Sequence, residues 1–259
     1  MIEKIVHYVW LGDNEIPVKF QDYINGWKQL HSEWQFILWN ENNFDVESNS
    51  WVNAAVKQKN YSLAADIIRS YVLLTHGGVY LDLDVEILKP LDSLVEENDF
   101  FIGYETDLWF GCAILGAKKG HRIIKEVYDR YLVLYDIIKS KSNMLCVLNF
   151  SAVIKRLYGV KLNGKTQKIA DNAMLYSADW FFPKNYMTHR IKITENTVAV
   201  HHYTSTWWSA GHRRGQRFAR RTRLILGKKL FSCFERIARK RMFRKLKKEY
   251  KSCFKIREG

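Results

Sequence analysis

The segment Gly77–Leu88, with the sequence GGVYLDLDVEIL, restricts what this 259-residue chain can fold into more than any other stretch. Apolar residues occupy every second position from Val79 to Ile87, which predicts a β-strand with one buried face. The positions between them share the opposite face of that strand, and they are Tyr80, Asp82, Asp84 and Glu86. Two carboxylates on one face require water, a cation or a polar ligand beside them, because a buried charge without a partner is costly.

The segments before this strand predict an α/β fold. Residues 3–13 and 35–40 are short β-rich runs, and residues 16–31 between them have a helical pattern. A strand, helix, strand opening predicts a βαβ unit and a largely parallel sheet. A second helix is predicted from Asn53 to Thr75, because apolar residues recur there at spacings of three and four and His76, Gly77 and Gly78 follow.

The later part of the chain predicts more strands of the same sheet. Residues 99–105 and 110–117 have the composition of two strands, and residues 196–203 that of a last strand. A helical segment is expected from His121 to about Lys141. Residues 143–179 show no clear pattern, and we leave them unassigned.

The charge of the chain divides it in two. Residues 211–259 contain 19 Lys and Arg against 3 Asp and Glu, whereas residues 1–210 contain 22 against 24. We therefore predict one domain over residues 1–210 and a basic tail over residues 211–259. Apolar residues recur at helical spacings within the tail, which indicates a basic amphipathic helix. Such a helix suits an anionic membrane surface, and it equally suits packing on the domain.

Two observations bear on the compartment. The sequence has no apolar run long enough to span a membrane, and its start lacks the features of a signal peptide. The cysteines are widely spaced, without a C-x-x-C pair, and they are Cys112, Cys146, Cys233 and Cys253. We expect a cytoplasmic protein with free thiols.

The carboxylates suggest a metal site. Same-face neighbours on a strand lie about 6.6 Å apart, so Asp82 and Asp84 are not expected to be equivalent ligands unless the strand ends there. Mg²⁺ or Mn²⁺ takes one or two carboxylates and completes its shell with water and phosphate oxygens. A solvated strand face is the alternative. Asp66 and Arg69, three residues apart on the preceding helix, have a weak surface ion pair as their alternative.

These residues together resemble a known family. The run AADIIRSYVLLTHGGVYLDLDVEIL, residues 64–88, resembles the conserved-spacing block of glycosyltransferase family 32, which carries a DXD sugar-binding region. The segments IVHYVWLG, GAKKGH and HHYTSTWW resemble further family features in the same order, so the likeness covers residues 1–208. The glucosyltransferase domain of large clostridial toxins is a more distant likeness. Both imply a GT-A fold, a Rossmann-like nucleotide-sugar-binding sheet flanked by helices.

The resemblance implies a role for each residue of the block. Asp84 would bind the metal directly, and Asp82 would reach the donor ribose or sugar and assist the metal through water. Tyr80 would lie near the donor. Asp66 and Arg69 would hold donor hydroxyls, with the Arg69 guanidinium suited also to phosphate.

Residues outside the block also acquire roles from the resemblance. Trp10 would stack on the nucleobase, with backbone groups near Val9 reading its edge, although a packed core tryptophan is the alternative. Asn42 would approach the donor sugar. Family members often have asparagine at the position of Cys112, and this departure leaves the sugar open.

The late segment AVHHYTSTWW offers one histidine to the metal. Only one of two adjacent strand residues can face the site, and we choose His202 as the ligand, with His201 as its packed neighbour. Ser205 and Trp207 would close over the β-phosphate of the donor.

The function expected from this likeness is that of a retaining, metal-dependent glycosyltransferase. It would use Mn²⁺ or Mg²⁺ and a nucleotide-sugar donor, a UDP-sugar first and a GDP-sugar as the alternative. It would act on a glycan acceptor, a lipid-linked one included, in O-antigen, lipopolysaccharide or capsule synthesis at the cytosolic face of the inner membrane. The rivals are a metal-dependent phosphohydrolase and a nucleic-acid-binding protein that uses the basic tail. The second leaves the DXD block unexplained, so nucleic acid is not the partner we expect.

Overall fold

The opening βαβ unit forms as predicted. The computed structural model of this protein describes residues 1–133, 145–186, 188–204 and the single residues 237, 241 and 244. Strand β1 (Ile5–Val9) pairs in parallel with β2 (Gln35–Trp39) over the full length of both. Helix α1 (Val18–Leu30) connects them and buries Phe20, Ile24 and Trp27 on its inner face.

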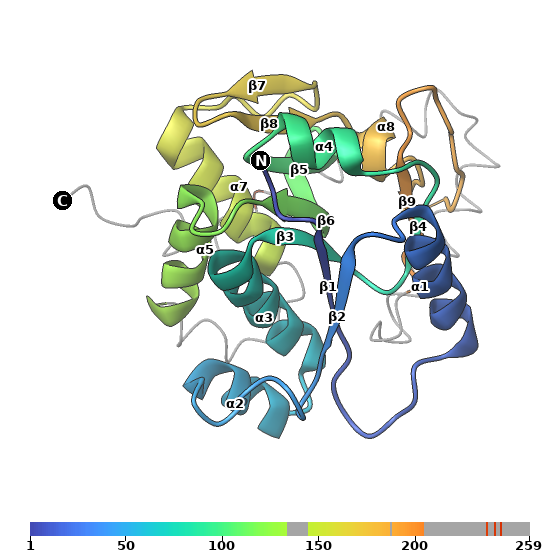
Figure 1. Cartoon of the computed structure of the whole chain (residues 1–259). Helices are drawn as coiled ribbons and strands as arrows, with labels where there is room; N and C mark the ends of the chain where they lie inside the picture. The colour runs from blue at the N-terminus through green and yellow to red at the C-terminus, as the bar shows by residue number, and fades with distance from the viewer. Residues whose placement is uncertain (134–144, 187, 205–236, 238–240, 242–243, 245–259) are drawn as a thin grey trace.

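Seven strands form the central sheet, in the order β2-β1-β3-β6-β5-β8-β7 (Figure 1). Strands β2, β1, β3, β5 and β8 run in one direction, while β6 and β7 run in the other. The prediction of a largely parallel sheet is thus confirmed, with one antiparallel strand inserted in its middle. The bounds are Gly78–Leu81 for β3, Phe100–Thr106 for β5, Trp109–Ala117 for β6, Gln167–Ile169 for β7 and Ala173–Tyr176 for β8.

The strand predicted from Val79 to Ile87 is wrong as a single element. Strand β3 ends at Leu81, and β4 (Val85–Ile87) leaves to pair with β9 (Ala199–His201) in a separate two-stranded antiparallel sheet. Between them the chain turns, and the backbone N–H of Val85 donates to the carbonyl of Asp82 over 3.1 Å. Apolar alternation runs unbroken through this turn because Leu83 is buried as well.

The helix predicted from Asn53 to Thr75 is two helices, α2 (Ser50–Lys57) and α3 (Tyr61–His76). Lys59 between them has a φ of 53°, which interrupts the helical path. The side chain of Asn60 then caps α3 by accepting from the backbone N–H of Leu63.

The remaining helices complete the two faces of the sheet. Helices α3, α5 and α7 lie together on one side, and α1, β4 and β9 lie on the other (Figure 1). The helix expected from His121 is α5, described as far as Val133, and the unassigned residues 143–179 include α7, β7 and β8. The bounds are Asp92–Glu97 for α4, Arg122–Val133 for α5, Leu145–Tyr158 for α7 and Ala178–Phe181 for α8.

Some predictions lie outside the described residues. The basic tail is one of them, since only residues 237, 241 and 244 of it are described. Cys112 and Cys146 are buried free thiols, as expected, whereas Cys233 and Cys253 lie outside. Within the described part of the chain, no helix combines the length and apolar character that a membrane span needs.

Candidate functional site

The candidate site lies where parallel strands end together. Strands β1, β2 and β3 run in one direction, so the segments that follow Val9, Trp39 and Leu81 emerge at the same edge of the sheet. The backbone N–H of Gly12 donates to Glu41 over 2.7 Å and ties the first two of these segments together. The turn with Asp82 and Asp84 is the third.

Three side chains at this edge could hold one metal ion. A carboxylate oxygen of Asp82, one of Asp84 and a ring nitrogen of His201 all lie within 4.8 Å of one another. His201 comes from the end of β9, which pairs with β4 directly opposite Val85. The end of β3 and the return of the chain 120 residues later therefore build the cluster together.

Asp84 is held as an anion by its surroundings. Burial would raise its pKa, but the charge of His201 and hydrogen bonds from His201 and Thr204 lower the pKa well below its usual range. The Nε2 atom of His201 lies 3.1 Å from Asp84 Oδ1. The backbone N–H and the hydroxyl of Thr204 donate to Asp84 Oδ2 over 2.8 and 2.9 Å. Both carboxylate oxygens are thus oriented before any ion binds.

The structure places His201, and not the expected His202, beside the carboxylates. His202 lies one residue beyond β9, and its ring points to the other side, where Nε2 contacts Glu86 Oε2 at 2.7 Å. It also stacks on Tyr23, with ring centroids 5.2 Å apart. The alternation argument was sound, but it assigned the two faces of the strand the wrong way round.

The donor set fits a divalent metal ion. Two carboxylates and an imidazole suit Mn²⁺, and Mg²⁺ would use mainly the carboxylates. The Nδ1 atom of His201 is buried without a hydrogen-bond partner among the described residues, so its ring is not committed elsewhere through that atom. Burial lowers the pKa of His201, but the charge and hydrogen bond of Asp84, together with the charges of Asp82 and Glu105, raise it above its usual value. A metal ion needs the neutral ring, so it would compete with a proton at His201.

Next to the metal cluster, one guanidinium joins two carboxylates. Arg69 Nη1 lies 2.8 Å from Asp66 Oδ1, and Nη2 lies 2.8 Å from Asp82 Oδ1. Asp66 is 7% and Arg69 is 4% exposed, so the alternative of a surface ion pair is wrong. The guanidinium also lies over the ring of Tyr80, 4.3 Å from its centroid. Asp66, Arg69, Tyr80 and Asp82 therefore form one connected group, in agreement with the roles that the family resemblance implied.

This buried group has an excess of negative charge. Two carboxylates share one cation, and burial raises the pKa of Asp66 to about 6, against the lowering effect of Arg69. The Nε atom of Arg69 is buried without a partner among the described residues. The hydroxyl groups of a sugar could donate hydrogen bonds to the carboxylates of Asp66 and Asp82, which have only one cation between them.

Two thiols, those of Cys146 and Cys112, lie next to the group formed by Asp66, Arg69, Tyr80 and Asp82. Arg69 Nη1 donates to Cys146 Sγ over 3.0 Å, and Cys146 lies in α7, 77 residues further along the chain. Burial, followed by the neighbouring Cys146, raises the pKa of Cys112 well above its usual range. The Cys112 thiol is therefore neutral at physiological pH, and the sulfur of Cys146 acts as a weak acceptor for Arg69.

The other residues predicted to bind the nucleotide-sugar donor lie at the same edge of the sheet or outside the described residues. Trp10 is half-buried, donates from Nε1 to the carbonyl of Asn14 over 2.6 Å and meets Phe20 edge to face. Val9 is buried, and Asn42 is exposed in the turn after β2. Tyr80 is buried below Arg69. Ser205 and Trp207 lie outside the described residues.

The structure adds four residues that the sequence analysis left out of the site. His201 and Thr204 contact Asp84, and Cys146 contacts Arg69. Glu105 influences the pKa of both His201 and Tyr203, so it too lies at the site, from the end of β5. No local sequence pattern predicts any of these contacts, because each contact joins segments that are far apart in the chain. The strained backbone of Tyr203, with a φ of 51°, is a structural signal of such a site.

The comparisons with known proteins agree with this geometry. Residues 17–101 match the model of the glycosyltransferase sugar-binding region containing DXD motif. The matched segment includes Asp66, Arg69, Tyr80, Asp82 and Asp84. The similarity to the DXD glycosyltransferases therefore covers the part of the chain that supplies both carboxylates of the metal cluster, whereas His201 lies outside the matched segment.

Two curated yeast proteins show the relationship in more detail. Inositol phosphoceramide mannosyltransferase 1 of Schizosaccharomyces pombe is 33% identical over 122 residues, 42% of this chain and 38% of that protein. Mannosyl phosphorylinositol ceramide synthase SUR1 of Saccharomyces cerevisiae is 30% identical over 141 residues, 51% of this chain and 36% of that protein. The alignments thus span less than two-fifths of the length of either relative.

A solved structure supports the fold. The PaToxG glycosyltransferase superposes with a TM-score of 0.51 at 17% sequence identity, over 60% of this chain and 69% of that one. The likeness extends to the arrangement of the sheet and its helices. The expected GT-A fold is thereby confirmed.

Proposed function

We propose that this protein transfers a hexose or N-acetylhexosamine from a nucleotide-diphosphate sugar to a glycan acceptor. The observation that carries the proposal is the convergence of Asp82, Asp84 and His201 beside the buried Arg69–Asp66 pair, within a matched DXD region. A UDP-sugar is our first candidate donor. The two yeast relatives are named for mannosyl transfer, so mannose from a GDP-sugar is the second.

In this proposal the DXD turn and His201 hold a divalent ion. The bound ion would neutralise the charge that develops on the nucleoside diphosphate as the glycosidic bond breaks. Thr204 and His201 fix the Asp84 carboxylate, so orienting the carboxylate costs nothing at the moment of reaction. Asp82 is shared with Arg69, which links the position of the ion to that of the sugar.

Asp66 and Arg69 would hold the donor sugar. Because Asp66 and Asp82 already fix the guanidinium, the sugar hydroxyls meet a rigid set of donors and acceptors. We propose retention of configuration, as the family resemblance implies, with attack on the face that the diphosphate leaves. No side chain at the described site is assigned here as a nucleophile.

We extend the proposal to a cellular role in surface polysaccharide synthesis. The tail of residues 211–259, with 19 basic against 3 acidic residues, suits the anionic cytosolic face of a membrane. A lipid-linked glycan acceptor would be found at that surface. O-antigen, lipopolysaccharide and capsule are the candidate products.

A thermal-shift panel tests the proposed function. UDP, GDP and CDP are each added with and without Mn²⁺ to the wild type and to Asp84→Asn, with Asp99→Asn as a control at the far edge of the sheet. A ligand that binds only the folded state raises the unfolding midpoint. We expect one nucleotide to raise it in a manner that needs Mn²⁺ and Asp84, and Asp99→Asn to respond like the wild type.

The same panel separates the rivals. No shift with any nucleotide, together with tight and salt-sensitive binding of RNA or DNA, would replace the proposal with the nucleic-acid reading. Release of inorganic phosphate from a nucleotide without sugar transfer would favour the phosphohydrolase.

A pair of neighbouring variants tests the metal site itself. His201→Gln removes a side chain of the metal cluster, whereas His202→Gln changes a residue of the same type one position away. We expect the first to weaken Mn²⁺ binding about tenfold or more and the second to leave Mn²⁺ affinity unchanged. The reverse result, measured by calorimetric titration of the metal, would restore His202 as the ligand.

A further inference from the structure

A group of four side chains beside the metal cluster has no role in the function described so far. It comprises Lys19 and Tyr23 of α1, Lys184 of the segment after α8, and His202, and we call it the lysine cluster. It borders the metal cluster directly, because the backbone N–H of His202 donates to the carbonyl of Asp84 over 2.9 Å.

The members of the lysine cluster hold one another in place. The ring of His202 stacks on Tyr23 at an interplanar angle of 11°. Lys184 Nζ donates to the backbone carbonyl of His202 over 2.5 Å, and Lys19 Nζ lies 5.9 Å from the centroid of Tyr23. Two ammonium groups from segments 165 residues apart thus converge on one stacked aromatic pair.

Neither ammonium group has a carboxylate partner in the part of the chain that the structure describes. Among the described residues, no Asp or Glu lies within ion-pair distance of Lys19 or Lys184. Two nearby acids contact histidines instead of the lysines: Glu86 contacts His202 within the cluster, and Asp84 contacts His201. Asp22 is exposed on α1 and pairs with neither lysine.

The two lysines also repel each other. Lys184 is half-buried, and its burial and the charge of Lys19 lower its pKa, against a smaller raising effect of Asp84. Two like charges that converge without a directly paired anion cost free energy, and a bound anion would lower that cost. Lysine ammonium groups bind phosphate as compact charges, with three donors each.

We propose that the lysine cluster is a phosphate-binding site, placed so that a phosphate group lies beside the metal cluster. The proposal rests on the proposed function for the identity of the phosphate. One source is the diphosphate of the donor, and the other is a phosphate group carried by the acceptor. Both offer the same charge and the same oxygen acceptors, and binding experiments distinguish them.

The test compares Lys184→Gln, Lys19→Gln and the double variant with Lys28→Gln. Lys28 is exposed on the same helix as Lys19, near its other end, and serves as the matched control. Calorimetric titrations measure pyrophosphate and inorganic phosphate on the free protein, then UDP and GDP with Mn²⁺. A last titration adds inorganic phosphate to protein saturated with the nucleotide that binds. Unfolding midpoints confirm that each variant folds.

We expect the double variant to bind pyrophosphate and phosphate about tenfold more weakly than Lys28→Gln does. If nucleotide binding weakens equally, the site takes the donor diphosphate. If nucleotide binding is unchanged and phosphate still binds to the nucleotide-saturated wild type, the site takes the phosphate of an acceptor.

Unchanged affinity of the double variant for phosphate, pyrophosphate and both nucleotides would overturn the phosphate site. A different result would contradict only the proposed function. In that case the wild-type protein would bind phosphate through these lysines but would bind no nucleotide. The two failures are therefore distinguishable within one set of titrations.

Discussion

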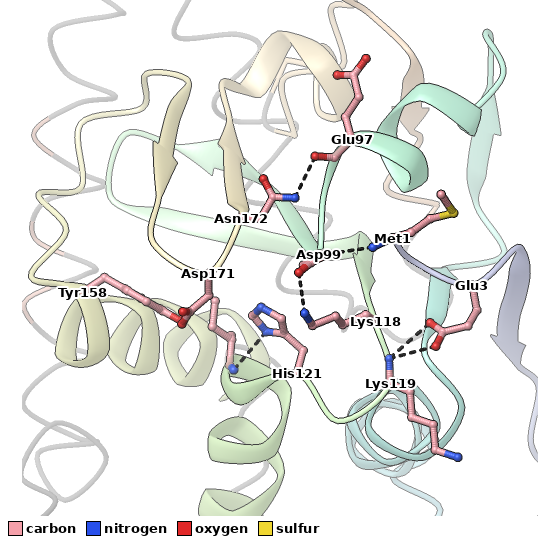
Figure 2. Close-up of polar contacts among 11 residues, drawn as sticks. Met1, Glu3, Glu97, Asp99, Lys118, Lys119, His121, Tyr158, Asp171 and Asn172 are labelled. Atoms are coloured by element: carbon pink, nitrogen blue, oxygen red, sulfur yellow. Dashed lines mark hydrogen bonds and ion pairs between the residues drawn. The ribbon is translucent and has the colours of Figure 1, made fainter.

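The two edges of the central sheet, where its parallel strands end and where they begin, differ in how their charged groups are paired. At the edge where β1, β2 and β3 end, the buried Arg69 is shared by the carboxylates of Asp66 and Asp82, and Lys19 and Lys184 lack acidic partners among the described residues. At the opposite edge, where β1, β5 and β8 begin, acidic and basic groups meet near the surface (Figure 2). One edge is poised for a ligand, and the other is complete without one.

The opposite edge fastens the N-terminus to the sheet. The terminal amino group of Met1 lies 2.7 Å from Asp99 Oδ1, and Lys118 contacts the other oxygen of that carboxylate. Glu3 accepts from the backbone N–H of Lys119, and Asn172 donates to the carbonyl of Glu97 (Figure 2). These contacts join segments that are far apart in the chain.

A glycine makes this fastening possible. Gly77 has a φ of 72°, and a Cβ atom there would lie 1.8 Å from a carboxylate oxygen of Glu3 and 2.6 Å from the backbone N of Lys119. The GG pair that helped to identify the DXD block therefore belongs to the opposite edge, where β1, β5 and β8 begin, which we call the structural edge. The aspartates five and seven residues later serve the functional one. The difference teaches that one short block supports both ends of a strand.

The largest effect should come from removing the shared cation. Arg69→Gln leaves Asp66 and Asp82 without their buried partner, and we expect a loss of about 3–5 kcal/mol in unfolding free energy at pH 8. Urea denaturation measures it. Arg156→Gln, which removes an exposed pair with Glu126, should cost about 1 kcal/mol or less. Equal losses in the two variants would remove the contrast between buried and exposed pairs.

The next effect is a pH dependence that arises between the two edges. His7 is buried, its Nε2 donates to the carbonyl of Gly77 and its Nδ1 accepts from Trp39, so both nitrogens require the neutral ring. Burial lowers the pKa of His7 from 6.5 to about 4. The unfolded chain therefore takes up a proton first as the pH falls, and stability should decrease by about 3 kcal/mol between pH 6.5 and pH 4.

The variant His7→Gln should remove most of that decrease, and His76→Gln, an exposed neighbour, should retain it. Unfolding free energies at half-unit pH intervals provide the measurement. An identical pH profile in both variants would show that another group is responsible.

A smaller effect of opposite sign is expected at Asp66. Its pKa is raised to about 6 by burial, so the folded state loses stability as the pH rises through that value and the carboxylate ionises. Asp66→Asn should therefore be about 1–2 kcal/mol more stable than the wild type at pH 8, with no gain at pH 4. Sugar transfer should fall about a hundredfold, because the donor hydroxyls lose an acceptor. A variant that is stabilised and fully active would place Asp66 outside the donor site.

The smallest effect belongs to the structural edge. Asp99 has a pKa lowered to about 2, first by Lys118 and then by the terminal amino group, so its contribution is present above pH 4 and is lost toward pH 2. Because the pairs are near the surface, Asp99→Asn should cost about 1 kcal/mol or less at pH 7. Nucleotide binding should be unaffected, and a loss of it would mean that the two edges are coupled.

The sequence predicted the elements whose patterns are local. Strands β1, β2, β5 and β6 and helix α1 follow from runs of apolar residues and the turns beside them. The family resemblance also placed Asp66, Arg69, Asp82 and Asp84 at one site, and the ion pairs of Arg69 with Asp66 and Asp82 were not visible in any pattern.

The failures have a common physical cause. The turn at Asp82–Asp84 was missed because Leu83 stays buried through it, and alternation alone does not reveal where a strand changes sheets. The choice between His201 and His202 depends on the register in which β9 pairs with β4. In that register His201 lies opposite Val85, and local sequence does not determine it. Contacts of Asp84 with Thr204 and of Arg69 with Cys146 depend on the packed fold.

The separation of Asp84 from its partners has a consequence for synthesis of the chain. Asp84 is made early, whereas His201 and Thr204 leave the ribosome about 120 residues later. A growing chain can form β1, α1, β2 and α3 while its DXD turn still lacks the second strand that shapes it. The metal set is therefore completed only after translation has passed Thr204, so chains truncated before that point carry the motif without the centre.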